Sequence, residues 1–368
     1  MKIVVDENIP AARALLGGLG ELRLLPGRAI DAASVRDADV LIVRSVTRVD
    51  GALLEGSRLC FVASATAGLD HVDVPALAER GIAFASAPGS NADSVVDYVL
   101  AVLALRYPAP GALAGRRIGI VGRGEVGSRL HGRLLALGAH CVVVDPHLPP
   151  ALAPASLAEA LGCEVLTLHV PLDVAGPHRT VHLLDAGRLA AMRPDALVIN
   201  TSRGAVVDST ALLARLEAEP EFAAALDVWE FEPEVDLSLL ARCLVGTPHI
   251  AGYAVDGKLR GLAQVCSALR AFLGRTDPAL EHPALSLPEA GGLPDGLQSW
   301  QQAALHAYDP RADDARLRAA LLAPPASRAA AFDRLRRDYP ARREFSAWRV
   351  GAAGFALAGE LRAAGFRA

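Results

Sequence analysis

The sequence predicts an α/β protein with two doubly wound parallel sheets, of the Rossmann or flavodoxin-like kind, and a smaller α/β or helix-rich unit at its C-terminal end. Short apolar runs recur along the first 255 residues and alternate with helical stretches, which is the pattern of β-α-β units. A glycine-rich turn directly after one such run is typical of a nucleotide-binding domain. With 368 residues, 52% of them hydrophobic, the chain is long enough for two or three domains.

The first unit is expected to reach about residue 92. Its predicted strands are the apolar runs at residues 2–5, 40–43, 60–63 and 82–85. Helical stretches separate these runs, as the crossovers of a parallel sheet require. A long helix at residues 94–106, apolar at helical spacing, leads to the next unit, and the Pro-Ala-Pro-Gly segment at residues 108–111 ends it.

The second unit is expected to carry the sheet of a nucleotide-binding domain. Its apolar runs lie at residues 118–121, 141–144, 165–168, 197–200, 223–226 and 243–245. Six strands are the number of a doubly wound nucleotide domain. A proline- and glycine-rich stretch at residues 277–294 then indicates a linker. The tail beyond it has helical patterns at residues 297–308, 312–322 and 327–339.

The glycine-rich turn predicts where a dinucleotide binds. The run at residues 117–121 is followed at once by Gly122-Arg123-Gly124-Glu125-Val126-Gly127, then by a helical pattern and a strand that ends in Asp145. Glycines at this spacing permit a tight turn and let the helix N-terminus face a pyrophosphate. An acid about 20 residues further on suits a ribose 2′-hydroxyl and repels a 2′-phosphate, so NAD is expected rather than NADP. Three glycines alone are weak evidence, but strand, turn, helix, strand and acid follow in order.

Three polar side chains follow predicted strands of the second unit. Arg203, Glu232 and His249 lie in the segments Asn-Thr-Ser-Arg-Gly, Trp-Glu-Phe-Glu-Pro and Thr-Pro-His-Ile-Ala-Gly. Because the carboxyl ends of parallel strands share one edge, we expect these side chains to lie close together. A guanidinium can grip a carboxylate with two hydrogen bonds, and an imidazole oriented by a carboxylate can take or return a hydroxyl proton. With a hydride acceptor present, these groups can oxidise a 2-hydroxy acid.

Each of these residues also has a simpler structural interpretation. A lone histidine is often a core residue bonded to backbone, and an arginine at a strand end often caps a helix or forms an ion pair. His249 follows Thr-Pro at a strand end, which favours a cleft. Glu230 competes with Glu232 for the carboxylate role and is expected to be a solvated neighbour. Asp73 and Asp97 are expected to be structural.

The chain resembles the D-2-hydroxyacid dehydrogenase family along nearly its whole length. Besides the segments above, the resemblance rests on motifs at residues 5–10, 43–47, 65–73, 87–92, 313–315 and 341–345. The catalytic segments match the wider family. The N-terminal motifs and the tail match a branch whose members oxidise a phosphorylated four-carbon hydroxy acid on the route to pyridoxal phosphate. This resemblance implies that Arg203, Glu232 and His249 are catalytic, Glu232 being selected by its distance of five residues from Asp227.

The resemblance also implies contacts to cofactor and substrate. Cofactor contacts are expected from Gly122, Gly124, Glu125, Val126, Gly127, Asp145, Val170, Thr201, Ser202, Arg203, Asp227 and Gly252. Val170 stands where relatives tend to carry a threonine, so only its backbone could serve, and Asp227 is the expected partner of the nicotinamide carboxamide. Substrate contacts are expected from Ser45, Thr66 and Tyr253, with Arg44, Arg342 and Arg343 as candidates for the substrate phosphate.

The resemblance predicts three domains. A substrate domain is expected at residues 1–92 and 256–280, a NAD-binding domain at residues 93–255, and a dimerisation domain at residues 285–368. The tail carries apolar residues beside many arginines, and a unit this small would be marginally stable alone. We therefore expect it to hold a homodimer together, since a symmetric dimer is the commonest oligomer. The alternative is a tail that only covers the core of its own chain.

Composition and charge exclude several other classes of protein. A formal net charge of −4 gives no basic footprint for nucleic acid. No apolar stretch approaches the roughly 20 residues that span a bilayer, and the first residues lack a signal-peptide profile, so we expect a cytoplasmic protein. The five cysteines have no metal-ligand spacing, and no metal is expected.

Two alternative functions remain open at this point. Another D-2-hydroxyacid dehydrogenase, such as a 3-phosphoglycerate enzyme, would share the catalytic trio. Its regulatory tail often has a βαββαβ pattern, whereas the tail here is helix-rich. A non-catalytic NAD-sensing protein would share the fold, but it would not need Arg203, Glu232 and His249 together.

Overall fold

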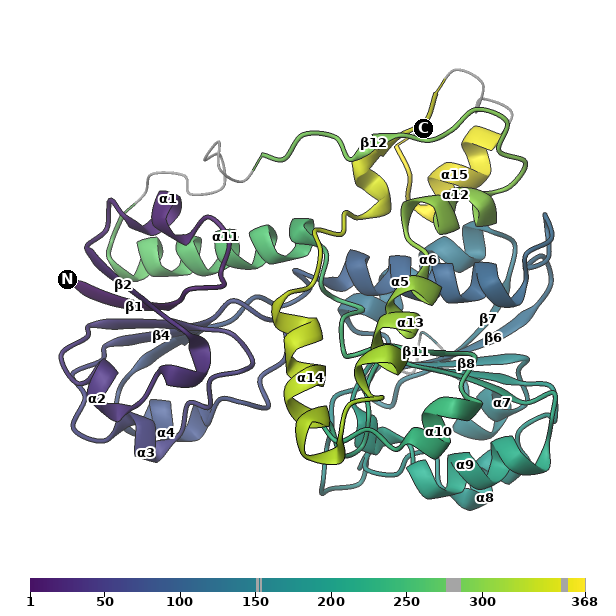
Figure 1. Ribbon diagram of the computed structural model, residues 1–368, viewed down its shortest axis with the longest axis horizontal. Coiled ribbons are helices and arrows are strands. Elements are labelled where there is room, and N and C mark those ends of the chain that lie inside the picture. The colour runs from purple at the N-terminus through teal and green to yellow at the C-terminus, as the bar shows by residue number, and fades with distance from the viewer. Residues whose placement is uncertain (150–151, 153, 276–285, 352–356, 368) are drawn as a thin grey trace. The chain divides into compact units, whose positions relative to one another are not determined.

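The computed structural model describes residues 1–149, 152, 154–275, 286–351 and 357–367, and the chain divides into two compact units (Figure 1). One unit comprises Met1–Asn91 with Tyr253–Pro288, and the other comprises Ala92–Gly252 with Glu289–Ala368. Each unit is therefore built from two stretches that lie far apart in the sequence.

The first unit is built on a five-stranded parallel sheet of order β2-β1-β3-β4-β5. Its strands are β1 (Lys2–Asp6), β2 (Glu21–Leu25), β3 (Val40–Val43), β4 (Phe61–Ser64) and β5 (Ala83–Ala85). The four predicted strands are present, and β3 and β4 are fully buried, as their continuous apolar runs require. The edge strand β2 was not predicted, because its alternation of Glu, Leu and Arg resembles neither a buried run nor a turn.

Helices cover both faces of this sheet. They are α1 (Ala12–Leu16), α2 (Ala32–Val35), α3 (Gly51–Leu54), α4 (Val74–Glu79) and α11 (Val255–Phe272). Asp73 accepts a hydrogen bond from Ala76 N (2.9 Å) and caps α4, which confirms its predicted structural role. α11 packs its buried face, with Leu262, Val265 and Leu269, into the same core as β1, β3 and β4.

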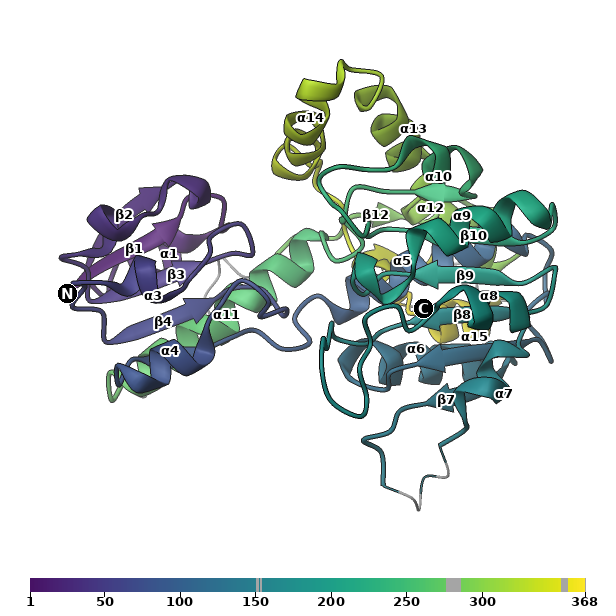
Figure 2. The ribbon, with the colours of Figure 1, turned by 90° about the horizontal axis from the view of Figure 1, so that it is seen from below.

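The second unit is built on a six-stranded parallel sheet of order β11-β10-β9-β8-β6-β7. Its strands are β6 (Arg117–Val121), β7 (His140–Val144), β8 (Val165–Leu168), β9 (Leu197–Asn200), β10 (Ala223–Leu226) and β11 (Val245–Gly246). The predicted number of six strands is confirmed, and Figure 2 shows β10, β9 and β8 as neighbours. The chain order reverses at β6, which has β7 on one side and β8 on the other. In sheets of this kind ligands bind at the carboxyl ends of the strands at such a reversal.

The helices of the second unit include α5 (Ala92–Arg106), which is almost entirely buried. They also include α6 (Glu125–Ala136), α7 (Leu157–Leu161), α8 (Ala186–Ala191), α9 (Ser209–Ala218) and α10 (Leu237–Arg242). In α5 the buried carboxylate of Asp97 accepts hydrogen bonds from Arg133 Nη1 of α6 (2.6 Å) and from Phe345 N (2.8 Å). Desolvation raises the pKa of Asp97 to about 7, against the opposing charge of Arg133. Asp97 thus has the structural role expected of it.

The tail forms α12 (Trp300–Ala307), α13 (Pro310–Ala320), α14 (Pro325–Arg337), α15 (Ala358–Ala364) and a two-stranded pair, β12 (Gly291–Gly292) with β13 (Trp348–Arg349). The prediction of a helix-rich tail is confirmed, with α12, α13 and α14 at the three expected places. α12 packs against α5, α15 against α6 and α13 against β11 (Figures 1 and 2). The tail therefore covers the core of its own nucleotide-binding unit.

Among the described residues, no helix is long and apolar enough to cross a membrane. Within the same part of the chain, no group of three or more histidine, cysteine, aspartate or glutamate side chains is arranged to hold a metal ion.

Candidate active site

The glycine-rich turn joins β6 to α6 and leaves space for a ligand above the sheet. Gly122 has a φ of 90°, and a Cβ there would collide with the carbonyl of His169. A Cβ on Gly127 would collide with the carbonyl of Gly122, so α6 can start this close to the strand only because both positions are glycine. Gly124 is the N-cap of α6 and is exposed. The free N–H groups of the first turn of α6 are therefore available to an anion.

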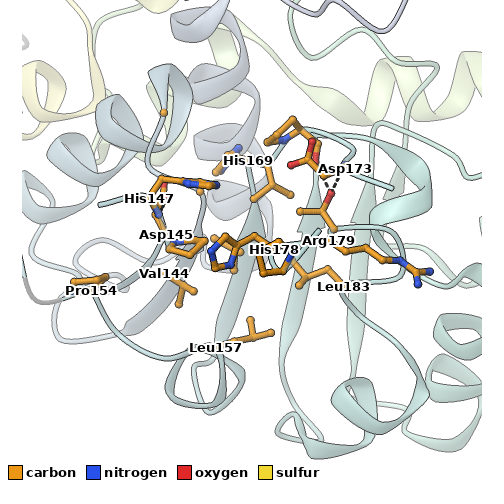
Figure 3. Close-up of a pocket in the computed structure, with 18 of the residues that line it drawn as sticks. Val144, Asp145, His147, Pro154, Leu157, His169, Asp173, His178, Arg179 and Leu183 are labelled. Carbon is orange, nitrogen blue, oxygen red and sulfur yellow. Dashed lines mark hydrogen bonds between the residues drawn. The ribbon is translucent and has the colours of Figure 1, made fainter. Parts of the chain in front are cut away.

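A cavity of about 500 Å³ opens between the ends of β6, β7 and β8. Gly122, Gly124, Asp145 and Val170 are the predicted cofactor residues that line it. Figure 3 shows Asp145 and His147 on one side of this cavity, and Asp173, Arg179 and Leu183 on the other. The volume lies in the usual range for small-molecule sites, and the position is the one expected at the reversal of strand order.

Asp145 ends β7 and shapes the turn at the rim of the cavity. Its Oδ2 accepts a hydrogen bond from Arg123 N (2.8 Å) and its Oδ1 accepts one from His147 N (2.9 Å). These bonds tie the glycine-rich turn to the segment after β7 and fix the carboxylate at the cavity. A carboxylate has about four lone-pair positions, so acceptor capacity remains for a ligand hydroxyl.

His169, which the sequence did not single out, lies at the base of the cavity. Its Nε2 is 2.9 Å from Thr167 Oγ1, and its Nδ1 is 3.4 Å from Thr201 Oγ1. Desolvation lowers the pKa of His169 to about 3, so its imidazole is neutral at physiological pH. The signal that could have found it is its position directly after β8, by the same strand-end reasoning that selected Arg203.

The other predicted cofactor residues lie outside the lining of the cavity. Glu125 and Val126 belong to the first turn of α6, where Glu125 pairs with Arg129 (3.2 Å). Ser202 is buried, and its N and Oγ both donate to Asn200 Oδ1, at 3.0 and 2.8 Å.

Asn200 also organises the segment that carries Arg203. Asn200 Nδ2 donates to Arg203 O (2.9 Å), so the amide holds the backbone on both sides of Ser202. Arg203 Nη1 donates to Ser202 O (2.8 Å), and the segment turns at once into a 3₁₀ turn, Gly204–Val206. A Cβ on Gly204 would collide with the backbone of Trp229, so this segment passes directly against the segment that carries Glu232.

His249 and Glu232 form the hydrogen-bonded pair that the sequence predicts. His249 Nδ1 lies 2.6 Å from Glu232 Oε1, and Glu232 Oε2 accepts from Trp229 N (3.2 Å). Although desolvation opposes it, the charge and hydrogen bond of His249, followed by the charge of Arg336, hold the pKa of Glu232 below its usual range. Glu232 is therefore a carboxylate at neutral pH, and with Nδ1 engaged, Nε2 is the nitrogen left for a substrate proton.

The loop of His249 is held by Asp227. His249 has a φ of 56°, in the left-handed region, and its N–H donates to Asp227 O (2.7 Å). The Asp227 carboxylate accepts hydrogen bonds from Thr247 Oγ1 (2.6 Å), Ile250 N (2.8 Å) and Ala251 N (2.8 Å). Only 1% of the residue is exposed. The structure thus gives Asp227 a role in holding the loop, beside the bond to a carboxamide that the resemblance implies. Gly252 follows Ala251 directly.

Glu230 is not the solvated neighbour that the sequence analysis expected. Its side chain is 11% exposed, its Oε1 lies 2.6 Å from His182 Nε2, and its Oε2 accepts from Ser209 N (3.0 Å). Glu230 thus joins three loops at the edge of the sheet. Its partners lie 48 and 21 residues away along the chain, so no local pattern could reveal them.

The predicted substrate residues Ser45, Thr66 and Tyr253 all lie in the first unit. Ser45 is exposed, two residues after the end of β3. Thr66 Oγ1 is 2.8 Å from Ser64 Oγ, which in turn is 3.0 Å from His71 Nε2. This hydrogen-bonded row gives Thr66 a defined orientation at the end of β4.

Tyr253 lies beside a cation that the sequence analysis did not select. The ammonium of Lys258 is 4.6 Å from the centre of the Tyr253 ring, within the range of a cation–π interaction. Lys258 is one of only two lysines in the chain, the other being Lys2. That rarity, five residues after a predicted substrate residue, is the signal that could have found it.

The arginines proposed for the substrate phosphate are engaged in other contacts. Arg44 grips the buried Asp6 carboxylate with Nε (3.0 Å) and Nη2 (3.2 Å). Arg342 is 8% exposed, and its Nη2 donates to the carbonyls of Ala251 and Ser94. Burial and carbonyl partners do not fit a phosphate-binding role for Arg342. Arg343 follows it, in the segment before β13.

Comparisons with known proteins agree with this arrangement. Residues 105–251 match a family model described as the D-isomer specific 2-hydroxyacid dehydrogenase, NAD binding domain. Residues 280–365 match a model described as a domain of unknown function.

Full-length relatives match almost end to end. The chain is 49% identical to an erythronate-4-phosphate dehydrogenase of Pseudomonas putida over 94% of this chain and 93% of that one. It is 47% identical to the protein of the same name from Pseudomonas aeruginosa over 96% of each chain.

Solved structures share the fold. A Thermus thermophilus protein aligns with a TM-score of 0.63 and 28% identity, covering 76% of this chain and 98% of that one. A D-lactate dehydrogenase of Aquifex aeolicus complexed with NAD and lactic acid aligns with a TM-score of 0.63 and 23% identity, covering 74% of this chain and 96% of that one.

Proposed function

The chain belongs to the erythronate-4-phosphate dehydrogenases within the D-2-hydroxyacid dehydrogenase family, and we propose that it oxidises 4-phospho-D-erythronate at C2 with NAD, in pyridoxal phosphate biosynthesis. The single observation that supports this most is the His249–Glu232 pair, at 2.6 Å, on the sheet that carries the nucleotide cavity. The oxidised product is (R)-3-hydroxy-2-oxo-4-phosphooxybutanoate.

The residues of the second unit fit NAD. Gly122 leaves the backbone clear beside the cavity, the first turn of α6 presents N–H groups, and Asp145 stands where a ribose 2′-hydroxyl needs an acceptor. NAD, when bound, supplies the hydride acceptor.

Arg203, His249 and Glu232 bind the substrate and transfer its proton. Arg203 holds the C1 carboxylate of the substrate and the C2 oxygen as it becomes a carbonyl oxygen. His249 Nε2 accepts the C2 hydroxyl proton, and Glu232 keeps the ring oriented and stabilises the imidazolium that forms. In the reverse direction the protonated His249 is the acid. General-base catalysis of this type typically contributes ~10²–10⁴-fold.

Ser45, Thr66 and Tyr253 are proposed to hold the substrate, and Lys258 its phosphate. Because the ammonium of Lys258 lies 4.6 Å from the ring centre of Tyr253, itself a proposed substrate residue, Lys258 is the cation proposed for the phosphate. Lys258→Met is expected to raise the KM for 4-phospho-D-erythronate more than tenfold and to leave the KM for erythronate unchanged. Lys2→Met is the matched control, since Lys2 pairs with the exposed Asp37 (2.6 Å). Equal KM changes for both substrates would contradict the assignment.

The deciding experiment compares substrates. Turnover of 4-phospho-D-erythronate is measured against 3-phosphoglycerate and unphosphorylated erythronate, with the bound cofactor identified after release. We expect kcat/KM at least tenfold higher for 4-phospho-D-erythronate, and loss of nearly all turnover in His249→Gln with NADH binding retained. A preference for 3-phosphoglycerate would refute 4-phospho-D-erythronate as the substrate, and an active His249→Gln variant would refute His249 as the base.

The tail is proposed to mediate a homodimer, and the protein to act in the cytoplasm. The support is that a symmetric dimer is the commonest oligomer and that the tail, in its described residues, lies outside the lining of the nucleotide cavity. Light scattering on the full chain should give twice the monomer mass. Hydrogen exchange on dilution should then show protection lost mainly after residue 285, whereas loss confined to earlier residues would place the interface elsewhere.

A further inference from the structure

The loop that carries His249 is strained and needs support. His249 lies at a φ of 56°, in the left-handed region that only a few per cent of residues other than glycine adopt, although asparagine, aspartate and histidine do so more often than the rest. Such a conformation is unfavourable in isolation and persists only where surrounding contacts hold it. Asp227 supplies contacts from within the sheet. Further contacts come from the tail.

The first tail contact reaches the start of the loop. Asp314 Oδ1, on α13, accepts a hydrogen bond from Gly246 N (2.8 Å), at the end of β11. Asp314 Oδ2 pairs with Arg318 Nε (2.8 Å), and Arg318 Nη2 donates to Cys243 O (3.1 Å). Two side chains of one helix thus bind the backbone on both sides of Val245, three residues before the Pro248–His249 bond.

The second tail contact reaches the end of the loop. Arg342 Nη2 donates to Ala251 O, the residue whose N–H binds Asp227, and to Ser94 O of α5 (3.3 Å). The guanidinium lies 4.4 Å from the centre of the Tyr308 ring of the tail. A planar guanidinium between an aromatic face and two carbonyls holds them rigidly, and a flexible ammonium can reproduce these contacts only in part.

Neighbouring bonds keep that guanidinium in place. Ser94 Oγ donates to Glu344 Oε1 (2.6 Å), and Phe345 N donates to Asp97 Oδ2 (2.8 Å). The two residues that follow Arg343 are therefore tied to α5, on either side of Val95 and Val96. The third tail element, α14, brings the charge of Arg336 to Glu232.

We propose that the tail, whose family model has no assigned function, positions the loop of His249 through Asp314 and Arg342. The two residues fix the loop at its opposite ends, so the imidazole stays against Glu232 with Nε2 presented for proton transfer. Both are positioning residues, because neither lines the nucleotide cavity. The inference rests on the proposed role of His249 as the base.

The test compares Arg342→Met, Arg342→Lys and Asp314→Ala with Arg328→Met as a matched control. Arg328 is a tail arginine that also donates to a backbone carbonyl, Ala323 O (3.1 Å), but within the tail. Turnover is expressed per NADH-binding site, so that a smaller amount of folded protein is not mistaken for a lower kcat. The melting temperature, the NADH Kd and the pH profile of kcat are measured alongside.

Arg342→Met and Asp314→Ala are expected to lower kcat per site by ~10–10²-fold, since a misplacement of about 1 Å costs this much. The NADH Kd should change less than threefold, the pH profile of kcat should shift, and Arg342→Lys should recover part of kcat. Arg328→Met should keep kcat within twofold. A kcat per site equal to the parent's in Asp314→Ala and in either Arg342 variant would overturn the proposal, and if Arg342→Met does not fold, the other two variants decide. Because His249→Gln tests the base separately, an inactive His249→Gln beside unaffected tail variants would refute only the positioning role.

Discussion

The substitution Asp227→Asn distinguishes two roles of this residue, which are support of the His249 loop and binding of the cofactor. In the structure the carboxylate accepts three hydrogen bonds, two at Oδ1 and one at Oδ2. An asparagine oxygen can replace Oδ1 and keep Thr247 and Ile250. Its NH₂ group would then face Ala251 N, so one donor would lose its acceptor and meet another donor.

The cost follows from the burial of the site. A hydrogen bond to a charged group contributes about 1.5–3 kcal/mol, and a buried donor left without a partner costs about 1–3 kcal/mol. Since these contributions overlap, we expect Asp227→Asn to destabilise the second unit by about 2–4 kcal/mol. A unit of this size loses about 2–4 °C of melting temperature per kcal/mol, so the melting temperature should fall by roughly 4–16 °C.

The assay combines thermal unfolding with NADH titration and turnover. Asp236→Asn is the matched control: Asp236 also accepts two backbone N–H groups, at 2.8 and 3.3 Å, but it is an exposed cap of α10, where asparagine serves equally well. Asp227→Asn should lower the melting temperature and kcat and leave the NADH Kd within about threefold. A variant with the parent's melting temperature and a much weaker NADH affinity would refute this reasoning and return Asp227 to the carboxamide.

Three further predictions concern charge. Glu232→Gln should shift the pH–rate profile, because the charge-assisted hydrogen bond between the carboxylate and the imidazolium is lost. Glu230→Gln, whose carboxylate pairs with His182, is the control and should leave the profile in place; a profile equally unmoved in Glu232→Gln would mean that Glu232 and His249 are not coupled. Asp145→Ala should reduce the preference for NAD over NADP, as a ratio of kcat/KM, by ~10–10²-fold, and an unchanged ratio would limit Asp145 to its turn with Arg123 and His147. Asp97 has a pKa of about 7 in the folded protein, above its unfolded value, so its contribution to the free energy of unfolding is fully present below about pH 4 and is lost as the pH rises to 7. Over that window Asp97→Asn should gain stability relative to the parent by up to about 1.4 kcal/mol per pH unit, as measured by urea unfolding. A difference in stability that does not change with pH would mean that Asp97 stays ionised beside Arg133.

Elements whose signal is local were predictable from the sequence. The buried strands β3, β4, β8 and β9 are short continuous apolar runs, and a parallel sheet covered on both faces requires that pattern. β2 was missed because an edge strand is only partly buried.

Helix starts in the tail show a different limit. α13 and α14 begin at Pro310 and Pro325, two residues before the expected positions. A proline fits the first helical position because it needs no donor there, and Asp309 supplies the cap of α13. The apolar pattern alone does not reveal a proline in the first turn of a helix.

Within the candidate site, side chains that follow neighbouring strands could be predicted to meet, whereas contacts between loops could not. Strand-end reasoning brought Glu232 and His249 together correctly, since both follow neighbouring strands. It did not reveal that Asp227 also binds Ile250 and Ala251, or that Glu230 binds His182, because these contacts depend on loop conformations that no periodic pattern encodes.

The buried carboxylate of Asp97 also makes the second unit a thermodynamic coupler. One of its oxygens binds Arg133 of α6, the helix whose first turn faces the cofactor cavity, and the other binds the backbone of the tail at Phe345. A ligand that orders the start of α6 therefore acts on the helix that this buried group ties to the tail. Where such a ligand and the tail affect each other through Asp97, linkage requires the effect to be equal in both directions.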